Sequence, residues 1–266
     1  MQALMKSGGF YNRIRKLHRL GVALGLFVLG LSTSAETALE IMAEDDAAPW
    51  SQADGSGAAN DIVKASFAAA GVDIVLRTVP YARCKHMVLT GQIAACFSMS
   101  ADASLGDKVV FADQPIYRVY TQYFHNPQHP LSAHNEAEIS RGAVVGIVNG
   151  YEYPTSVTAL AQRGIVLEAA GSEKANLKKL AAGRLDAAVA QLDEFKSVEY
   201  LTQEAHVEGL VQPVFRASQL GSYIGFSTQH AQGLWARDRF NEGFAKIRSN
   251  GTLQTIMAKW RAQTSH

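Results

Sequence analysis

Two stretches of this sequence decide its fold class: Gly91-Gln92-Ile93-Ala94-Ala95-Cys96-Phe97 and Gly183-Arg184-Leu185-Asp186-Ala187-Ala188-Val189. They align position by position and lie 92 positions apart. Each begins with a glycine that ends a helix-like pattern and continues as a short apolar run, which is typical of a buried strand. Their recurrence predicts a helix–glycine–strand unit that occurs twice.

The patterns around both stretches extend this repeated unit. In the first unit, we expect helices over residues 60–70 and 81–90 and strands over 72–79 and 92–97. In the second unit, we expect helices over 155–163 and 172–182 and strands over 165–169 and 185–190. Strands that alternate with helices predict mainly parallel sheets flanked by helices.

Further strand-like runs at 116–124 and 222–226 predict two crossings between two lobes, which together would form a hinge. Apolar residues at helical spacing after the second run predict closing helices that return to the first lobe. We therefore expect an α/β protein with two lobes, two mainly parallel sheets and a two-strand hinge. The predicted domains are lobe 1 at 36–120 and 222–266, and lobe 2 at 121–221.

The first 35 residues are typical of a secretory signal peptide. Five basic residues and no acidic residue precede a 12-residue apolar run at 20–31, and small residues follow up to Ala35. The run is shorter than the roughly 20 residues that span a membrane. Cleavage after Ala35 would change the formal charge from +1 to −4 and leave a periplasmic protein; an uncleaved anchor is the alternative.

Composition excludes several classes of function. The 266 residues are 47% hydrophobic and 18% charged, which is an ordinary globular balance. A near-neutral charge gives no basic surface for nucleic acid. We find no nucleophile elbow, phosphate loop or zinc-protease motif. His125, His129 and His134 cluster without metal-ligand spacing, so we expect neither a metal nor a cofactor.

Polar and aromatic residues follow the predicted strands, at the sheet edge where open α/β folds bind ligands. Trp50 and Tyr81 are candidates for flat apolar walls, and Arg83 for holding an anionic group. Gly150, placed before a helix, leaves backbone N–H groups for an anion. The full set of candidate ligand-binding residues is Asp45, Trp50, Tyr81, Arg83, Ser98, Ser100, Asn149, Gly150, Tyr151, Gln191 and Asp193.

Several phrases in this order resemble the family 3 bacterial extracellular solute-binding proteins, which are the amino-acid-type periplasmic binding proteins. The phrases are Ala48-Pro49-Trp50, Val79-Pro80-Tyr81-Ala82-Arg83-Cys84, Phe111-Ala112-Asp113-Gln114-Pro115, Val145-Gly146-Ile147-Val148-Asn149-Gly150-Tyr151 and Leu180-Ala181-Ala182-Gly183-Arg184-Leu185-Asp186-Ala187. The resemblance covers nearly all of the chain after the signal peptide. It implies two α/β lobes that close around a ligand.

The sequence departs from this family where an amino acid is usually held. The family's arginine for the α-carboxylate is missing from residues 100–108, and the position of its aspartate for the α-amino group holds Gln191. Arg83 and Asp193 are possible substitutes. The resemblance therefore implies a small polar solute, amino-acid-like or related, without naming it.

Cys84 and Cys96 are expected to form a disulfide if the protein is exported, and to be two buried thiols otherwise. The predicted function is that of a monomeric periplasmic protein that captures a solute for an ABC permease. Two alternatives remain open. One is an orphan binding protein that reports to a membrane sensor. The other is a dehydratase-type enzyme, for which Glu44, Asp45 or Glu152 would supply a carboxyl group of raised pKa.

Overall fold

The repeated unit predicted from the sequence is present in the structure. A computed structural model describes residues 38–264, so the predicted signal peptide lies outside the described residues. Ala95 opens strand β5 and lies opposite Ile41, whereas Ala187 opens β10 and lies opposite Val145, both in parallel register. The glycines that precede the two strands, Gly91 and Gly183, share a φ of 69°, which a side chain rarely tolerates.

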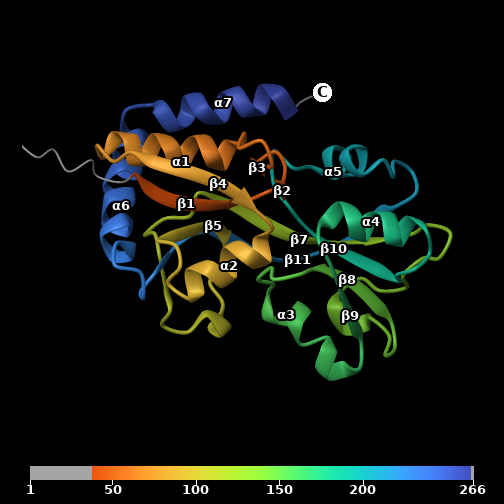
Figure 1. Cartoon of the computed structure of the whole chain (residues 1–266). Helices are drawn as coiled ribbons and strands as arrows, with labels where there is room; N and C mark the ends of the chain where they lie inside the picture. Colours follow the sequence, from red (N-terminus) through yellow and green to blue (C-terminus); the bar gives the residue numbers. More distant parts are fainter. Residues whose placement is uncertain (1–37, 265–266) are drawn as a thin grey trace, which may run out of the picture. The chain divides into compact units, whose positions relative to one another are not determined.

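Lobe 1 is built on the parallel strands β4, β1 and β5, with β6 and the last part of β11 running antiparallel beside them. Helices α1 and α6 cover one face of this sheet, with α7 packed against both of them, and α2 covers the other face (Figure 1). The elements are β1 (Leu39–Glu44), β2 (Asp46–Ala47), β3 (Ser51–Gln52), α1 (Ala58–Ala69), β4 (Ile74–Val79), α2 (Tyr81–Leu89), β5 (Ala95–Met99), η1 (Ala103–Leu105), β6 (Val109–Phe111), α6 (Gly233–Ser249) and α7 (Thr252–Thr264).

Lobe 2 repeats this plan with the parallel strands β10, β8 and β9. Helices α4 and α5 bury Leu177 and Leu201 against one face of the sheet, and α3 buries Val157 against the other. The elements are η2 (Glu136–Glu138), β8 (Val144–Val148), α3 (Thr155–Thr158), η3 (Ala161–Arg163), β9 (Val166–Ala170), α4 (Glu173–Ala181), β10 (Ala187–Leu192) and α5 (Val198–Ala205).

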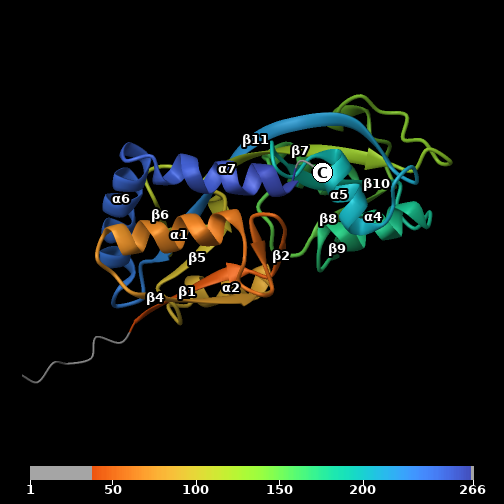
Figure 2. The same cartoon turned by 90° about the horizontal axis from the view of Figure 1, so that it is seen from above.

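The long antiparallel strands β7 (Tyr117–His125) and β11 (Gln212–Ser227) connect the lobes and lie side by side (Figure 2). β7 pairs with β10 of lobe 2, whereas the end of β11 pairs with β5 and β6 of lobe 1. The two sheets are therefore joined into one path of strands, β4-β1-β5-β11-β7-β10-β8-β9. This pair of strands is where we expected a hinge.

Two predicted elements differ from those in the structure. The helix expected over 155–163 is a four-residue α3 followed by the separate turn η3. The strand expected over 222–226 is the end of the 16-residue β11. No residue of the first part of β11, 212–221, is buried, and polar residues interrupt its apolar ones, so the apolar pattern marked only the buried end.

Each strand of lobe 1 contributes to two cores because successive side chains point to opposite faces. Ile41 and Phe97 pack with α1 and α6, whereas Met42 and Cys96 pack with α2. Within residues 38–264, no helix combines the length and hydropathy that crossing a bilayer requires.

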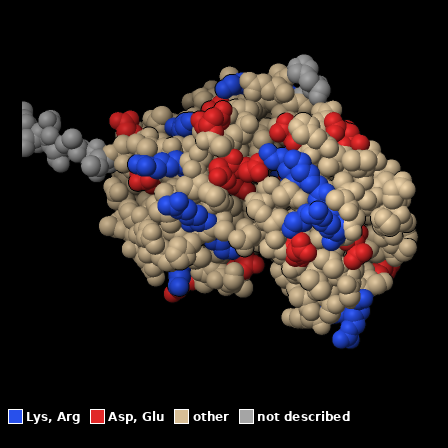
Figure 3. Space-filling model, turned by 45° about the vertical axis from the view of Figure 1, so that its right-hand side comes forward, with Lys and Arg blue, Asp and Glu red and all other residues tan. Residues whose placement is uncertain are grey.

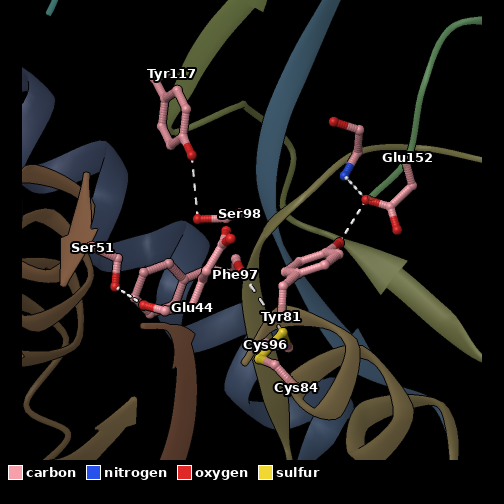
Figure 4. The surroundings of a disulfide bond; sticks show 10 residues. Glu44, Ser51, Tyr81, Cys84, Cys96, Phe97, Ser98, Tyr117 and Glu152 are labelled. Atoms are coloured by element: carbon pink, nitrogen blue, oxygen red, sulfur yellow. Dashed lines mark hydrogen bonds between the residues drawn. A yellow bond between two sulfur atoms is a disulfide. The ribbon is translucent and has the colours of Figure 1, made fainter. Parts of the chain in front are cut away.

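A disulfide between Cys84 and Cys96 fastens α2 to β5, with 5.7 Å between the two Cα atoms (Figure 4). We expect the Cys84→Ser, Cys96→Ser double variant to lose about 3 kcal/mol of unfolding free energy, which is the chain-entropy value for a loop of this size. Urea denaturation of oxidised and dithiothreitol-treated protein would measure it, and the reduced protein should match the variant. Two free thiols in the unreduced, denatured protein would contradict the bond.

Candidate functional site

Residues from the ends of both sets of strands meet at a small pocket between the lobes, here called the interlobe pocket. Its free volume is about 10 Å³, enough for one water molecule. Its lining residues are Glu44, Ala47, Trp50, Ser98, Tyr117, Val119, Tyr151, Gln191, Asp193 and Lys196. Five of the candidate residues, Trp50, Ser98, Tyr151, Gln191 and Asp193, are therefore brought together. The lobes are closed on one another in this structure.

Trp50 is the most enclosed aromatic residue of the pocket. Its ring stacks on Tyr117, with 3.8 Å between centroids and 6° between planes, and its other neighbour Phe195 lies at 5.0 Å. Its indole Nε1–H donates a 2.6 Å hydrogen bond to Asp193 Oδ2. Trp50 was predicted to form an open apolar wall for a ligand. In this structure its ring is covered by Tyr117 and Phe195 instead.

Asp193 follows β10 and is held by a local turn. Its Oδ1 accepts the backbone N–H of Phe195 at 2.7 Å and of Lys196 at 3.0 Å, while Oδ2 faces Trp50. Burial raises the pKa of Asp193, and these hydrogen bonds act in the opposite direction. The carboxylate links lobe 2 to the tryptophan of lobe 1.

Glu44 ends β1 and is buried, with an exposed fraction of 4%. Tyr151 donates its hydroxyl to Glu44 Oε1. Burial raises the pKa of Glu44 to about 8; the Tyr151 hydrogen bond and Lys196 act to lower it, and Glu173 and Asp46 to raise it. At neutral pH this carboxyl group is therefore mainly protonated, which makes it a hydrogen-bond donor as well as an acceptor.

A buried ion pair lies behind the pocket in lobe 2. Lys196 Nζ lies 2.5 Å from Glu173 Oε2, and Glu173 Oε1 accepts the backbone N–H of Gln191. Burial acts to lower the pKa of Lys196, but the Glu173 carboxylate raises it above its usual value. Lys196 therefore stays charged and supplies positive potential to the pocket.

A second group of contacts joins the lobes beside the pocket. The Tyr81 hydroxyl donates to Glu152 Oε2 at 2.6 Å, and Lys85 Nζ lies 2.7 Å from Glu152 Oε1. The Ser100 backbone N–H also donates to Glu152 Oε2, at 3.0 Å. Figure 4 shows the Tyr81 hydroxyl directed at the Glu152 carboxylate. Burial raises the pKa of Tyr81 well above its usual value, so the hydroxyl keeps its proton.

Two other candidates have a defined local role. Ser98 accepts a 3.2 Å hydrogen bond from Tyr117 and has a φ of 69°, a conformation that non-glycine residues adopt mainly where the surroundings impose it. Gly150 has a φ of 87°, and a Cβ there would lie 3.0 Å from the Cα of Ala82 in α2. Glycine at this position lets the loop of lobe 2 approach lobe 1.

Six candidates do not line the interlobe pocket. Tyr81, Ser100 and Gly150 lie at the contacts beside it, and the other three lie elsewhere. Arg83 is exposed because α2 presents positions 81 and 85 on one face and position 83 on another. Asn149 is also exposed, and only its backbone N–H, bonded to Ala170, is fixed. Asp45 lines an open groove of about 620 Å³ along both lobes, because it follows Glu44 and points away from the pocket.

The same groove carries a charged contact between the lobes: Lys174 Nζ lies 2.5 Å from Asp46 Oδ1. In the view of Figure 3, acidic and basic side chains form small neighbouring groups, without a large patch of one sign. Such exposed pairs contribute little to stability. The buried contacts of the interlobe pocket therefore contribute more to holding the lobes together.

Four residues of the site were not predicted: Lys85, Tyr117, Glu173 and Lys196. The helical spacing of four between Tyr81 and Lys85 is a signal that could have found Lys85. Tyr117 is the second residue of the strand predicted over 116–124, but no pattern marks it as facing Trp50. The pairing of Glu173 with Lys196 has no signal in the sequence because it depends on how α4 packs beside β10.

Comparisons with known proteins give structural matches but no sequence match. No protein-family model matches this chain, and no curated protein matches it. The sensor domain of a histidine kinase, described as similar to periplasmic binding proteins, superposes with a TM-score of 0.71 at 21% identity, over 84% of this chain and 96% of that chain.

Two amino-acid-binding proteins superpose similarly. An ancestral arginine-binding protein bound to arginine gives a TM-score of 0.70 at 18% identity, over 84% of this chain and 97% of the other. An ancestral amino-acid-binding protein, described as a precursor of cyclohexadienyl dehydratase, gives 0.65 at 16% identity, over 84% and 94%.

The fold is therefore that of the periplasmic binding proteins. Several of its structural neighbours are amino-acid-binding proteins, the type that the sequence motifs resemble. At these identities the likeness concerns the fold, and the solute has to be argued from the chain's own residues.

Proposed function

We propose that this protein captures a small polar solute between its two lobes and delivers it to an ABC permease. The observation that carries the proposal is the convergence of strand-end residues from both lobes on the interlobe pocket. Two strands alone connect the lobe sheets in the described chain, so a change in their curvature would open the cleft. Both lobes would then contribute to one binding site.

The chemistry of the pocket supports a polar solute. Ser98, Tyr117 and Gln191 offer neutral donors and acceptors, whereas Asp193 and Lys196 offer charges of both signs. The pocket holds about one water molecule when closed. A solute therefore enters an opened cleft and replaces contacts that the lobes make with each other here.

A thermal-shift panel tests the capture of a solute. At 100 times its dissociation constant, a bound solute adds about 2.7 kcal/mol of stability. For a chain of this size we expect a rise in Tm of roughly 5–11 °C. The panel would hold amino acids, polyamines, organic acids and short peptides, with the protein unfolded and refolded first to remove any co-purified solute.

A change in the radius of gyration by small-angle scattering, seen only with the stabilising solute, would support capture by lobe movement. A refolded protein that no member of a broad panel stabilises would contradict the proposal. A sensor role in place of transport predicts the same binding, and a neighbouring gene for a signalling protein rather than a permease and an ATPase would favour it.

A second candidate function is a dehydratase. Glu44 favours it, because a buried carboxyl group with a pKa of about 8 is suited to donate a proton at neutral pH. Turnover of a prephenate-like acid, lost in Glu44→Gln but kept in Glu40→Gln on the same strand, would support this enzyme. Solute binding without any turnover would favour capture.

A further inference from the structure

Glu152 belongs to lobe 2 in sequence, but its side chain lies among groups of lobe 1. It follows β8 and precedes α3, and it is 5% exposed. Its carboxylate meets the Tyr81 hydroxyl at 2.6 Å, the Ser100 backbone N–H at 3.0 Å and Lys85 Nζ at 2.7 Å. These three donors form what is here called the carboxylate cradle.

The carboxylate cradle is matched to an anion with two oxygens. A cation faces Oε1, and two neutral donors share Oε2. Hydrogen bonds to a carboxylate are stronger than those between neutral groups, and buried donors left unpaired are costly. The three donors therefore require a carboxylate or an equivalent anion whenever the lobes are closed.

The cradle is built from lobe 1 alone. Tyr81 and Lys85 lie one helical turn apart on α2, and Ser100 follows β5. The Cys84–Cys96 disulfide fastens these two elements to each other. The two elements that carry these groups therefore stay together when the lobes separate. In the closed form Lys85 Nζ also donates to the Gly150 backbone carbonyl of lobe 2 at 3.0 Å, and Tyr81 packs edge-on against Tyr151.

Glu152 is in turn presented by lobe 2. Gln191 of β10 donates its side-chain N–H to the Glu152 backbone carbonyl at 2.8 Å. Separation of the lobes would therefore withdraw the Glu152 side chain and leave the cradle open to the cleft. The neighbouring interlobe pocket, with about 10 Å³, has no room for a second carboxylate in the closed form.

We propose that Glu152 is a tethered occupant of this cradle and that the solute carries a carboxylate that displaces it. The inference rests on the proposed capture of a solute and narrows that solute to small carboxylic acids, amino acids included. In this arrangement Glu152 competes with the solute for the cradle. A solute carboxylate binds only if the solute's other contacts contribute more free energy than is lost when Glu152 leaves the cradle. The missing family arginine is consistent with this, because Lys85 supplies the cation.

Acetate tests the cradle directly, with acetamide as its neutral counterpart and sodium chloride at equal ionic strength. In Glu152→Ala, acetate at about five times its dissociation constant is expected to raise Tm by about 2–4 °C in a saturable way. Acetamide and chloride should not. The unaltered protein and the matched variant Glu168→Ala, a lobe 2 glutamate paired with Lys179 at the surface, should show no saturable rise over the same range.

The acetate response should disappear when Lys85→Met is added to Glu152→Ala. If Glu152→Ala does not give a cooperative unfolding transition, Glu152→Ser takes its place, because the short side chain vacates the cradle and keeps a polar group. A folded Glu152 variant without an acetate-specific rise would overturn the inference, and so would an equal rise in the unaltered protein. The acetate titration and the solute panel fail separately. If the panel gives a stabilising solute but the Glu152 variant does not respond to acetate, only the role of the cradle is overturned. If the panel is silent but the variant responds to acetate, only the proposed capture of a solute is overturned.

Discussion

Trp50→Ala is expected to lower the unfolding free energy by about 3–5 kcal/mol, the usual range for removing a buried tryptophan. The side chain is 2% exposed and lies between Tyr117 and Phe195. Its loss leaves a cavity at the junction of the lobes. It also leaves Asp193 Oδ2 without the indole N–H, so a buried carboxylate loses a partner.

Chemical denaturation followed by far-ultraviolet circular dichroism would measure the effect without depending on tryptophan fluorescence. Trp235→Ala is the matched control, because Trp235 is 40% exposed on α6 and its removal should change stability by at most about 0.5 kcal/mol. Trp50→Phe should give an intermediate loss, since it keeps a ring but not the N–H. Equal stability of Trp50→Ala and Trp235→Ala would show that Trp50 does not join the lobes as described.

The free energy of unfolding is expected to fall as the pH rises from about 5 to about 8. The Glu44→Gln substitution should remove much of this dependence on pH. Burial raises the pKa of Glu44 from 4.5 to about 8 in the folded protein. Between these values the folded state holds a proton that the unfolded state has released. A group of this kind makes the folded state less stable with rising pH, by up to several kcal/mol over the window.

Denaturant titrations at pH 5, 6, 7 and 8 would give the slope of unfolding free energy against pH for the unaltered protein, for Glu44→Gln and for a control. Glu40→Gln on the same strand is the control, because its side chain is exposed beside Arg77. Asp193, Glu173, Lys196 and the histidines are present in all three proteins, so the difference between the slopes isolates Glu44. Parallel pH profiles for Glu44→Gln and the unaltered protein would contradict a buried, protonated Glu44.

The repeated unit was predictable because it depends on local chemistry. A glycine that ends a helix and a short, mainly apolar run are visible in the sequence, and both copies lie where expected. The length of β11 was not predictable, because residues 212–221 are exposed or half-buried and their apolar residues are interrupted by polar ones. The break between α3 and η3 likewise left no mark in the spacing of apolar residues.

The candidate site was predictable in outline. Ends of parallel strands meet at one edge, so Trp50, Ser98, Gln191 and Asp193 could be chosen from strand positions alone. Arg83 shows the limit of that reasoning. It has suitable chemistry and lies within the right segment, but the turn of α2 directs Lys85 to Glu152 and leaves Arg83 exposed.

By itself, the sequence determined the α/β class, the two lobes and the strand ends that bear the site, because periodicity and glycine positions act over a few residues. Only the tertiary structure decided which groups meet across the lobes. Glu152 in the cradle of lobe 1, Trp50 against Asp193 and the buried proton on Glu44 each join residues more than 70 positions apart or depend on the burial that such contacts create. Burial and pairing between distant segments determine the chemistry of this site, and local sequence patterns predict neither of them.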